Sequence, residues 1–202
     1  MTQPDFAAAE HYAWQRLEHE LSPDLIYHSV RHTRDDVVPA VERLAAMEGI
    51  GEEDCRLVRL AAIYHDLGFI EQYTGHEYVG MRIAGDVLPD FGFAAAQVAT
   101  IANIILATKL PQSPHTILEE IMADADLDVF GRDDFFIRNA ALRTELAHYD
   151  RPISDVEWYT SQLKFLQEHS YFTPAARQLR GPTKQRNLEE LAARLRRLSV
   201  VT

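Results

Sequence analysis

Apolar residues recur at helical spacing along nearly the whole chain, and no run alternates as a β-strand does over a useful length. The run AAAQVATIANIILAT at residues 94–108 is almost wholly apolar, so we expect it to be the central buried helix. Further helices are expected at residues 6–20, 24–47, 52–65, 76–88, 116–128 and 133–149, and after Ser154, Thr173 and Asn187. The sequence therefore predicts an all-α fold, a single-domain helical bundle of about eight or nine helices.

A chain of 202 residues is long enough for one domain with a hydrophobic core. We expect residues 1–202 to form that domain, with residues 187–202 as a peripheral C-terminal helix. This helix is also a candidate contact in a homodimer. Basic residues number 20 against 31 acidic ones, which gives a net charge of −11. Because phosphate neutralisation needs clustered Lys and Arg, this balance excludes a general binder of nucleic acid polymers.

Several other classes of protein are disfavoured by what the sequence lacks. The single cysteine, Cys55, excludes an intrachain disulfide and a cysteine-based zinc site. The first residues have neither the basic start nor the apolar core of a signal peptide. No apolar run reaches the length that a membrane span needs. We therefore expect a cytoplasmic protein without a membrane segment.

Two histidines, His28 and His32, lie four residues apart in the segment YHSVRHTRDDV. On a helix, positions four apart share one face with Cβ atoms about 5–6 Å apart, so the two imidazoles can share a site. Taken alone, such a pair is more often two ordinary surface or core histidines. Its meaning therefore depends on what else the fold brings to it.

A second feature is His65-Asp66, which follows the apolar run LAAIY directly. Adjacent helical residues point about 100° apart, so both can face one ion only at a helix terminus or a distorted turn. A buried ionisable pair is costly unless something such as a divalent cation offsets the burial. A third feature is the alternation of Asp124, Asp126 and Asp128, of which at most one or two can enter a core site. Imidazoles and carboxylates together suit Mn, Fe, Co, Zn or Mg.

The order His32, then His65-Asp66, then Asp126 resembles the H…HD…D pattern of the HD-domain superfamily of metal-dependent phosphohydrolases. The resemblance covers residues 27–128. YHSVRHTRDDV is similar to the cyclic-nucleotide phosphodiesterase branch, and HDLGF with GHE and DADLD-FG looks like an uncharacterised bacterial group. The resemblance to the superfamily implies a helical bundle in which His32, His65, Asp66 and Asp126 hold one or two divalent ions, from among Mn, Fe, Co, Zn, Ni and Mg. The aspartate motif of the cyclic-nucleotide phosphodiesterase branch favours Asp126 over Asp124 as the ligand.

Other residues receive roles beside this centre. The resemblance implies that His28 is the proton donor to the leaving oxygen, and Asp66 is the ligand able to bridge two ions. His76 is a candidate for a second metal, and Glu77 for orienting a ligand histidine, although an acidic residue also suits a helix start. Lys109 is a candidate phosphate-binding residue, or equally a solvated lysine at a helix C-terminus.

The function that these expectations support is a metal-dependent hydrolase of phosphate esters that uses a metal-activated water. The substrate is expected to be a nucleotide or another small phosphorylated metabolite, as a phosphomonoester or phosphodiester. The alternative is a metal- and nucleotide-binding regulatory module without turnover. The GYP motif of cyclic-di-GMP hydrolases is absent and the purine-binding glutamine of animal-type phosphodiesterases cannot be placed, so the substrate stays open.

Overall fold

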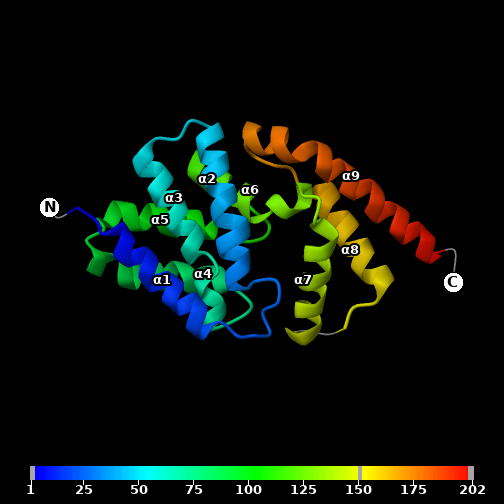
Figure 1. Cartoon of the computed structure of the whole chain (residues 1–202), viewed down its shortest axis with the longest axis horizontal. Coiled ribbons are helices and arrows are strands. Elements are labelled where there is room, and N and C mark those ends of the chain that lie inside the picture. The colour runs from blue at the N-terminus through cyan, green and yellow to red at the C-terminus, as the bar shows by residue number, and fades with distance from the viewer. Residues whose placement is uncertain (1–2, 150–151, 200–202) are drawn as a thin grey trace.

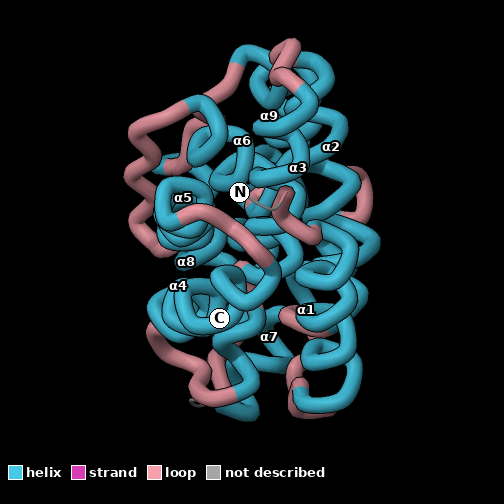
Figure 2. Tube along the Cα trace, turned by 90° about the vertical axis from the view of Figure 1, so that its left-hand side faces the viewer, coloured by secondary structure: helices cyan, strands magenta, loops and turns pink. Residues whose placement is uncertain are grey.

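The computed structural model describes residues 3–149 and 152–199. Over these ranges it contains helices and connecting loops and no strand, which confirms the all-α prediction (Figures 1 and 2). None of the described helices combines the length and the apolarity that crossing a lipid bilayer requires. The α-helices are α1 (Phe6–Glu20), α2 (Val38–Met47), α3 (Glu52–Tyr64), α4 (His76–Val87), α5 (Ala95–Leu106), α6 (Ile117–Asp126), α7 (Phe135–Tyr149), α8 (Asp155–Glu168) and α9 (Pro174–Ser199). The shorter turns are the π-helix η1 (His32–Val37) and the 3₁₀-helices η2 (Leu67–Ile70), η3 (Leu88–Phe91) and η4 (Asp128–Gly131).

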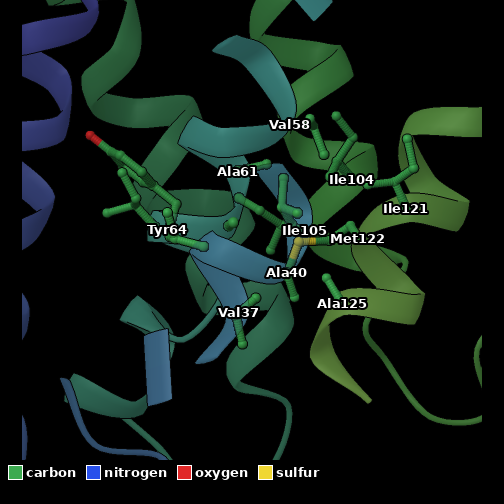
Figure 3. Packing of buried hydrophobic residues seen from close by; sticks show 14 of the residues in the cluster. Val37, Ala40, Val58, Ala61, Tyr64, Ile104, Ile105, Ile121, Met122 and Ala125 are labelled. Atoms are coloured by element: carbon green, nitrogen blue, oxygen red, sulfur yellow. The ribbon is translucent and has the colours of Figure 1, made fainter. Parts of the chain in front are cut away.

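The central helix of the core is α3. Each residue from 60 to 67 is at most 2% exposed, so this segment is covered on all sides. The small side chains of Ala61 and Ala62 allow α1, α2, α5 and α6 to pack closely around it. Figure 3 shows Val58 and Ala61 of α3 among isoleucines of α5 and α6. His65 and Asp66 lie near the end of this segment, so the densely packed core holds them on all sides.

The prediction that residues 94–108 form the central buried helix is wrong. Helix α5 packs against α3, α4 and α6 but has exposed positions along its length. Ile101, Ile104 and Ile105 are buried there, whereas the alanines 94–96 are exposed. Alanine favours the helical conformation whether or not it is buried. An alanine-rich segment therefore looks apolar on every face in the sequence, although only one face of the helix packs against the core.

The predicted helix at residues 24–47 begins later than expected. Tyr27 and His28 precede it, helical structure starts at Val30, and η1 interrupts it before α2. The N–H of Val38 donates to the carbonyl of Thr33, five residues back, which is the π-helical pattern. Pro39 follows and has no N–H to donate, so the regular α-helical ladder is already broken at this point. The helical spacing argument for His28 and His32 therefore does not hold.

Helices α7 and α8 lie to the right of the others in Figure 1, and α9 runs from above α6 to the far right. Helix α8 begins at the expected capping box, with the N–H of Glu157 donating to Ser154 Oγ at 3.3 Å and the N–H of Ser154 donating to Glu157 Oε2 at 3.1 Å. Helix α9 is continuous through Pro182, so residues 187–199 are its second half rather than a separate helix. Residues 200–202 of the expected terminal helix lie outside the described residues.

Candidate metal centre

His65 and Asp66 lie where α3 ends and the chain tightens into η2. The His65 ring is oriented by a 2.7 Å hydrogen bond from Nδ1 to the carbonyl of Ala62, which leaves Nε2 as the ring atom that faces the cluster. This Nε2 lies 3.2 Å from Asp66 Oδ1. The helix terminus thus allows two adjacent residues to face one point, as their spacing requires.

His32 and Asp126 approach the same point from other segments. His32 is the first residue of η1, and Asp126 is the last residue of α6. His32 Nε2 lies 3.3 Å from Asp126 Oδ1 and 3.8 Å from Asp66 Oδ2. His65 Nε2 lies 3.6 Å from Asp126 Oδ1. Four residues that are spread over 95 positions of the sequence therefore converge on one small volume.

The residues present fit a divalent cation. One ligand atom each from His32, His65 and Asp66 lie within 4.8 Å of one another. His65 Nε2 and Asp66 Oδ2 are buried and have no hydrogen-bond partner, which is an expensive state for polar atoms. Ligands about 2.1 Å from one ion sit roughly 3–3.4 Å apart, close to the shorter separations seen here. Two imidazoles and two carboxylates make a donor set that suits Zn, Mn, Fe or Co.

The electrostatics of this cluster also favour a cation. Burial alone would raise the pKa of Asp66, but His65, followed by His28 and His32, holds that pKa below its usual range. Burial would likewise raise the pKa of Asp126, and His32 and His65 lower it. Burial lowers the pKa of His65, yet Asp66 and Asp126 outweigh it and raise that pKa well above the usual value. The carboxylates are thus ionised, and the site attracts positive charge.

A charged network behind His32 fixes its other face. Asp36 Oδ2 lies 3.8 Å from His32 Nδ1. Arg132 and Arg138 contact the same carboxylate at 2.6 Å and 2.7 Å. Burial alone would raise the pKa of Asp36, but His32 and the two arginines hold it well below its usual range. An ionised Asp36 orients His32 and gives the ring a carboxylate on the side away from the cluster.

His28 lies beside the cluster and is held by Glu145 of α7. The ring centroids of His28 and His32 are 5.8 Å apart, although no helix joins them in the way the sequence suggested. Glu145 is fully buried, and its carboxylate accepts from the N–H of Tyr27 at 2.7 Å and from the N–H of His28 at 3.0 Å. It also contacts His28 Nδ1 at 2.5 Å, and Tyr73 Oη donates to it at 3.0 Å. With Nδ1 donating to this carboxylate, His28 keeps Nε2 for a ligand.

Sequence reasoning missed Glu145 entirely. It lies 117 positions from His28, in a helix whose apolar pattern is weak, so no local motif marks it. The signal that was available is indirect. Two consecutive backbone N–H groups ahead of a helix need an acceptor, and a buried carboxylate supplies it.

His76 and Glu77 open α4 next to Asp66. His76 Nε2 lies 3.7 Å from Asp66 Oδ1, and the ring of Phe69 stacks on His76 with centroids 3.7 Å apart. The approach of α4 depends on Gly68, because a Cβ there would lie 1.9 Å from the carbonyl oxygen of His76. The carboxylate of Glu77 is 3.8 Å from His76 Nδ1, on the side of the ring opposite the Nε2 that faces Asp66. Its expected role in orienting a ligand histidine stays a prediction.

The remaining predicted residues lie elsewhere. Lys109 is exposed with its ammonium 5.2 Å from the ring of Tyr78. Asp124 is buried and accepts hydrogen bonds from the N–H groups of Phe172 and Thr173, each at 2.8 Å, at the start of α9. Asp128 pairs with Arg180 at 2.7 Å. Of the three alternating aspartates, Asp126 is the one that the structure brings to the two histidines.

A cavity of about 300 Å³ opens beside the cluster. His28, Asp66, His76, Glu77 and Asp126 line one end of it. Lys109 does not line it, although its neighbours Thr108 and Leu110 do. The cluster is therefore accessible to a small molecule, which a purely structural ion site does not require.

The sequence was compared with models of known protein families. A family model described as the HD domain matches residues 19–128, more than half of the chain. The chain belongs to the HD-domain family. No curated protein and no solved structure gives a significant match. The HD segment contains His32, His65, Asp66 and Asp126 and ends before Glu145, and metal-dependent phosphohydrolases are typical of the HD family.

Proposed function

We propose that the protein is a metal-dependent phosphohydrolase that cleaves small phosphate esters. The observation that supports this most is the pair of buried, unpartnered atoms, His65 Nε2 and Asp66 Oδ2, beside a cavity that Asp66 and His28 line. A structural site would close over its ion and would have no need of a cavity or of a third imidazole held at the edge.

His32, His65, Asp66 and Asp126 would hold the cation. A divalent ion bound there supplies Lewis acidity toward a phosphoryl oxygen and lowers the pKa of water to near neutrality. His76 Nε2 lies close enough to Asp66 Oδ1, at 3.7 Å, for Asp66 to be shared with a second ion. Whether one or two ions bind is decided by whether His76 takes part.

His28 would hold the proton for the leaving oxygen on Nε2. Glu145 fixes the ring by accepting from Nδ1 and at the same time fixes the backbone of residues 27 and 28. The ring of Phe69 packs on the His28 ring with centroids 4.5 Å apart and prevents it from rotating. General acid catalysis by a positioned side chain is worth about 10²–10⁴ in rate, so this arrangement accounts for a substantial part of turnover.

The test is to measure the metal content of the freshly purified protein and then to screen phosphate esters with that metal. We expect about one or two equivalents of a divalent transition metal per chain, and metal-dependent release of phosphate or of a phosphomonoester. Failure to bind any divalent metal, on purification and on titration, would exclude the hydrolase. Metal binding without turnover of any ester would support the regulatory module that binds metal and nucleotide.

A further inference from the structure

The cavity beside the candidate metal centre has two chemically different ends. The end at the cluster is acidic and carries Asp66, Glu77 and Asp126. The other end is a chamber that η4, α7 and α8 enclose. Its apolar lining, which we call the apolar chamber, includes Leu127, Phe130, Phe135, Leu142, Leu146 and Phe165.

Helix α7 builds one wall of the apolar chamber. Phe135, Asn139, Leu142 and Leu146 are spaced by four, three and four residues, so they lie on one face of the helix. All four line the cavity. Phe135 is buried in the core, whereas Leu142 and Leu146 are half-buried and stand outside the packed hydrophobic cluster of the described residues. Two leucines that face inward and yet have unfilled space beside them form a surface that an apolar ligand would cover.

The two polar side chains of the chamber wall, Asn139 and Gln162, are hydrogen-bonded to each other. The indole N–H of Trp158 donates to Asn139 Oδ1 at 2.8 Å, and Asn139 Nδ2 donates to Gln162 Oε1 at 2.6 Å. Because an indole N–H can only donate, the Asn139 amide must present its oxygen to Trp158 and its nitrogen to Gln162. The Gln162 amide must then present its oxygen to Asn139. The hydroxyl groups of a sugar would therefore lose their water in the chamber and meet mostly carbon.

Charge argues against a polyphosphate in the same cavity. Among the described residues, no lysine or arginine lines it, and the three carboxylates at the acidic end repel anions. The candidate metal centre can neutralise one phosphate at its position. A second phosphate farther along would have no cationic partner.

We propose that the apolar chamber binds the organic group of the substrate, so that the enzyme prefers phosphate esters of apolar alcohols to nucleotides and sugar phosphates. This proposal rests on the phosphohydrolase function above, because it places the phosphate at the candidate metal centre. The phosphate then sits at the acidic end, with the apolar group between α7 and α8.

The experiment compares primary alkyl esters with similar leaving groups: butyl phosphate, hexyl phosphate, glucose 6-phosphate and AMP. Burial of one methylene is worth roughly a threefold to fourfold change in affinity, so kcat/KM should rise about tenfold from butyl to hexyl phosphate. Hexyl phosphate should exceed glucose 6-phosphate and AMP by at least that factor. Faster hydrolysis of AMP or glucose 6-phosphate would overturn the proposal.

Variants of the chamber wall provide the matched comparison. Leu142→Asn and Leu146→Asn, made separately, should each reduce the hexyl-to-butyl ratio of kcat/KM toward one. Ile137→Asn is the control, because Ile137 lies on the same helix but is 73% exposed and does not line the cavity. A hexyl-to-butyl ratio that stays at its wild-type value in both leucine variants would overturn the proposal.

A second readout needs neither metal nor turnover. Saturation-transfer NMR should detect binding of 1-hexanol to the wild type and to Ile137→Asn, and weaker binding to the two leucine variants. If no ester is hydrolysed but 1-hexanol binds in this pattern, the hydrolase function fails and the apolar chamber stands. If 1-hexanol does not bind to the wild type, the chamber proposal fails, whatever the esters show.

Discussion

The HD segment at residues 19–128 and the helices α7–α9 contribute to the site in different ways. The HD segment supplies the four candidate ligands from a core in which residues 60–67 are at most 2% exposed. The later helices supply one carboxylate, Glu145, and an apolar wall whose leucines are half-buried. In the proposed enzyme, the packed core would thus hold the metal in fixed geometry, and the later helices would contact the organic group of the substrate.

The largest effect is expected inside the HD segment. Asp66→Asn removes the carboxylate that lies within 3.8 Å of His32, His65 and His76. Both the metal content and turnover should fall to background, as elemental analysis and phosphate release would show. The exposed Asp35→Asn, on η1, should change neither. A metal content that survives in Asp66→Asn would place the ion elsewhere.

The next largest effect concerns the contact between His28 of the HD segment and Glu145 of α7. His28→Gln should leave the metal content intact and lower kcat by about 10²–10⁴. Glu145→Gln should lower kcat by a smaller factor, because the amide still accepts hydrogen bonds but carries no charge to hold the ring. The double variant should be no slower than His28→Gln alone if Glu145 acts through His28. Additive losses would show that the α7 carboxylate has its own role.

A third comparison separates two aspartates of α6. Asp124→Asn should reduce the free energy of unfolding by about 1–3 kcal/mol, because the start of α9 loses a buried acceptor of charged hydrogen bonds. Its metal content should stay near that of the wild type. Asp126→Asn should show the opposite pattern, with metal lost and with the unfolding of the metal-free protein in urea little changed. A reversal would mean that Asp124 is the ligand.

The smallest effect at neutral pH is expected in the C-terminal helices, where a buried histidine makes stability depend on pH. Both ring nitrogens of His169 are buried without a hydrogen-bond partner, and burial, with Lys184 nearby, lowers the pKa of His169 to about 4. The unfolded chain binds this proton near the usual pKa of about 6.5. The neutral ring therefore contributes full stability above pH 6.5, and that stability is lost as the pH falls from 6.5 toward 4.

His169→Leu should remove this acid sensitivity, which amounts to at most about 1.4 kcal/mol per pH unit. Thermal unfolding between pH 4 and 7 would measure it, with the exposed His19→Leu as the control. An unchanged pH profile in His169→Leu would mean that His169 has the same pKa in the folded and unfolded states.

Local signals predicted much of the fold. Helix α1 has the expected bounds, and the capping box at Ser154 starts α8, because periodicity and capping act over a few residues. The chemistry of His32, His65, Asp66 and Asp126 also has a recognisable order in the sequence. The errors arose where distant residues decide the structure. Residues 27–28 leave the helix because Glu145 binds their N–H groups, and α5 is exposed on one side because α3 already fills the centre.

The π-helix η1 has a consequence for how relatives of this chain can diverge. It accommodates an extra residue between His32 and the helix that packs into the core. Losing one residue there would restore an ordinary α-helix and swing His32 about 100° around the axis, away from Asp66 and Asp126. The bundle would survive such a deletion, but the histidine would no longer meet its partners. Relatives of this chain that have lost a residue in this stretch should therefore keep the helical bundle but lose the candidate metal centre.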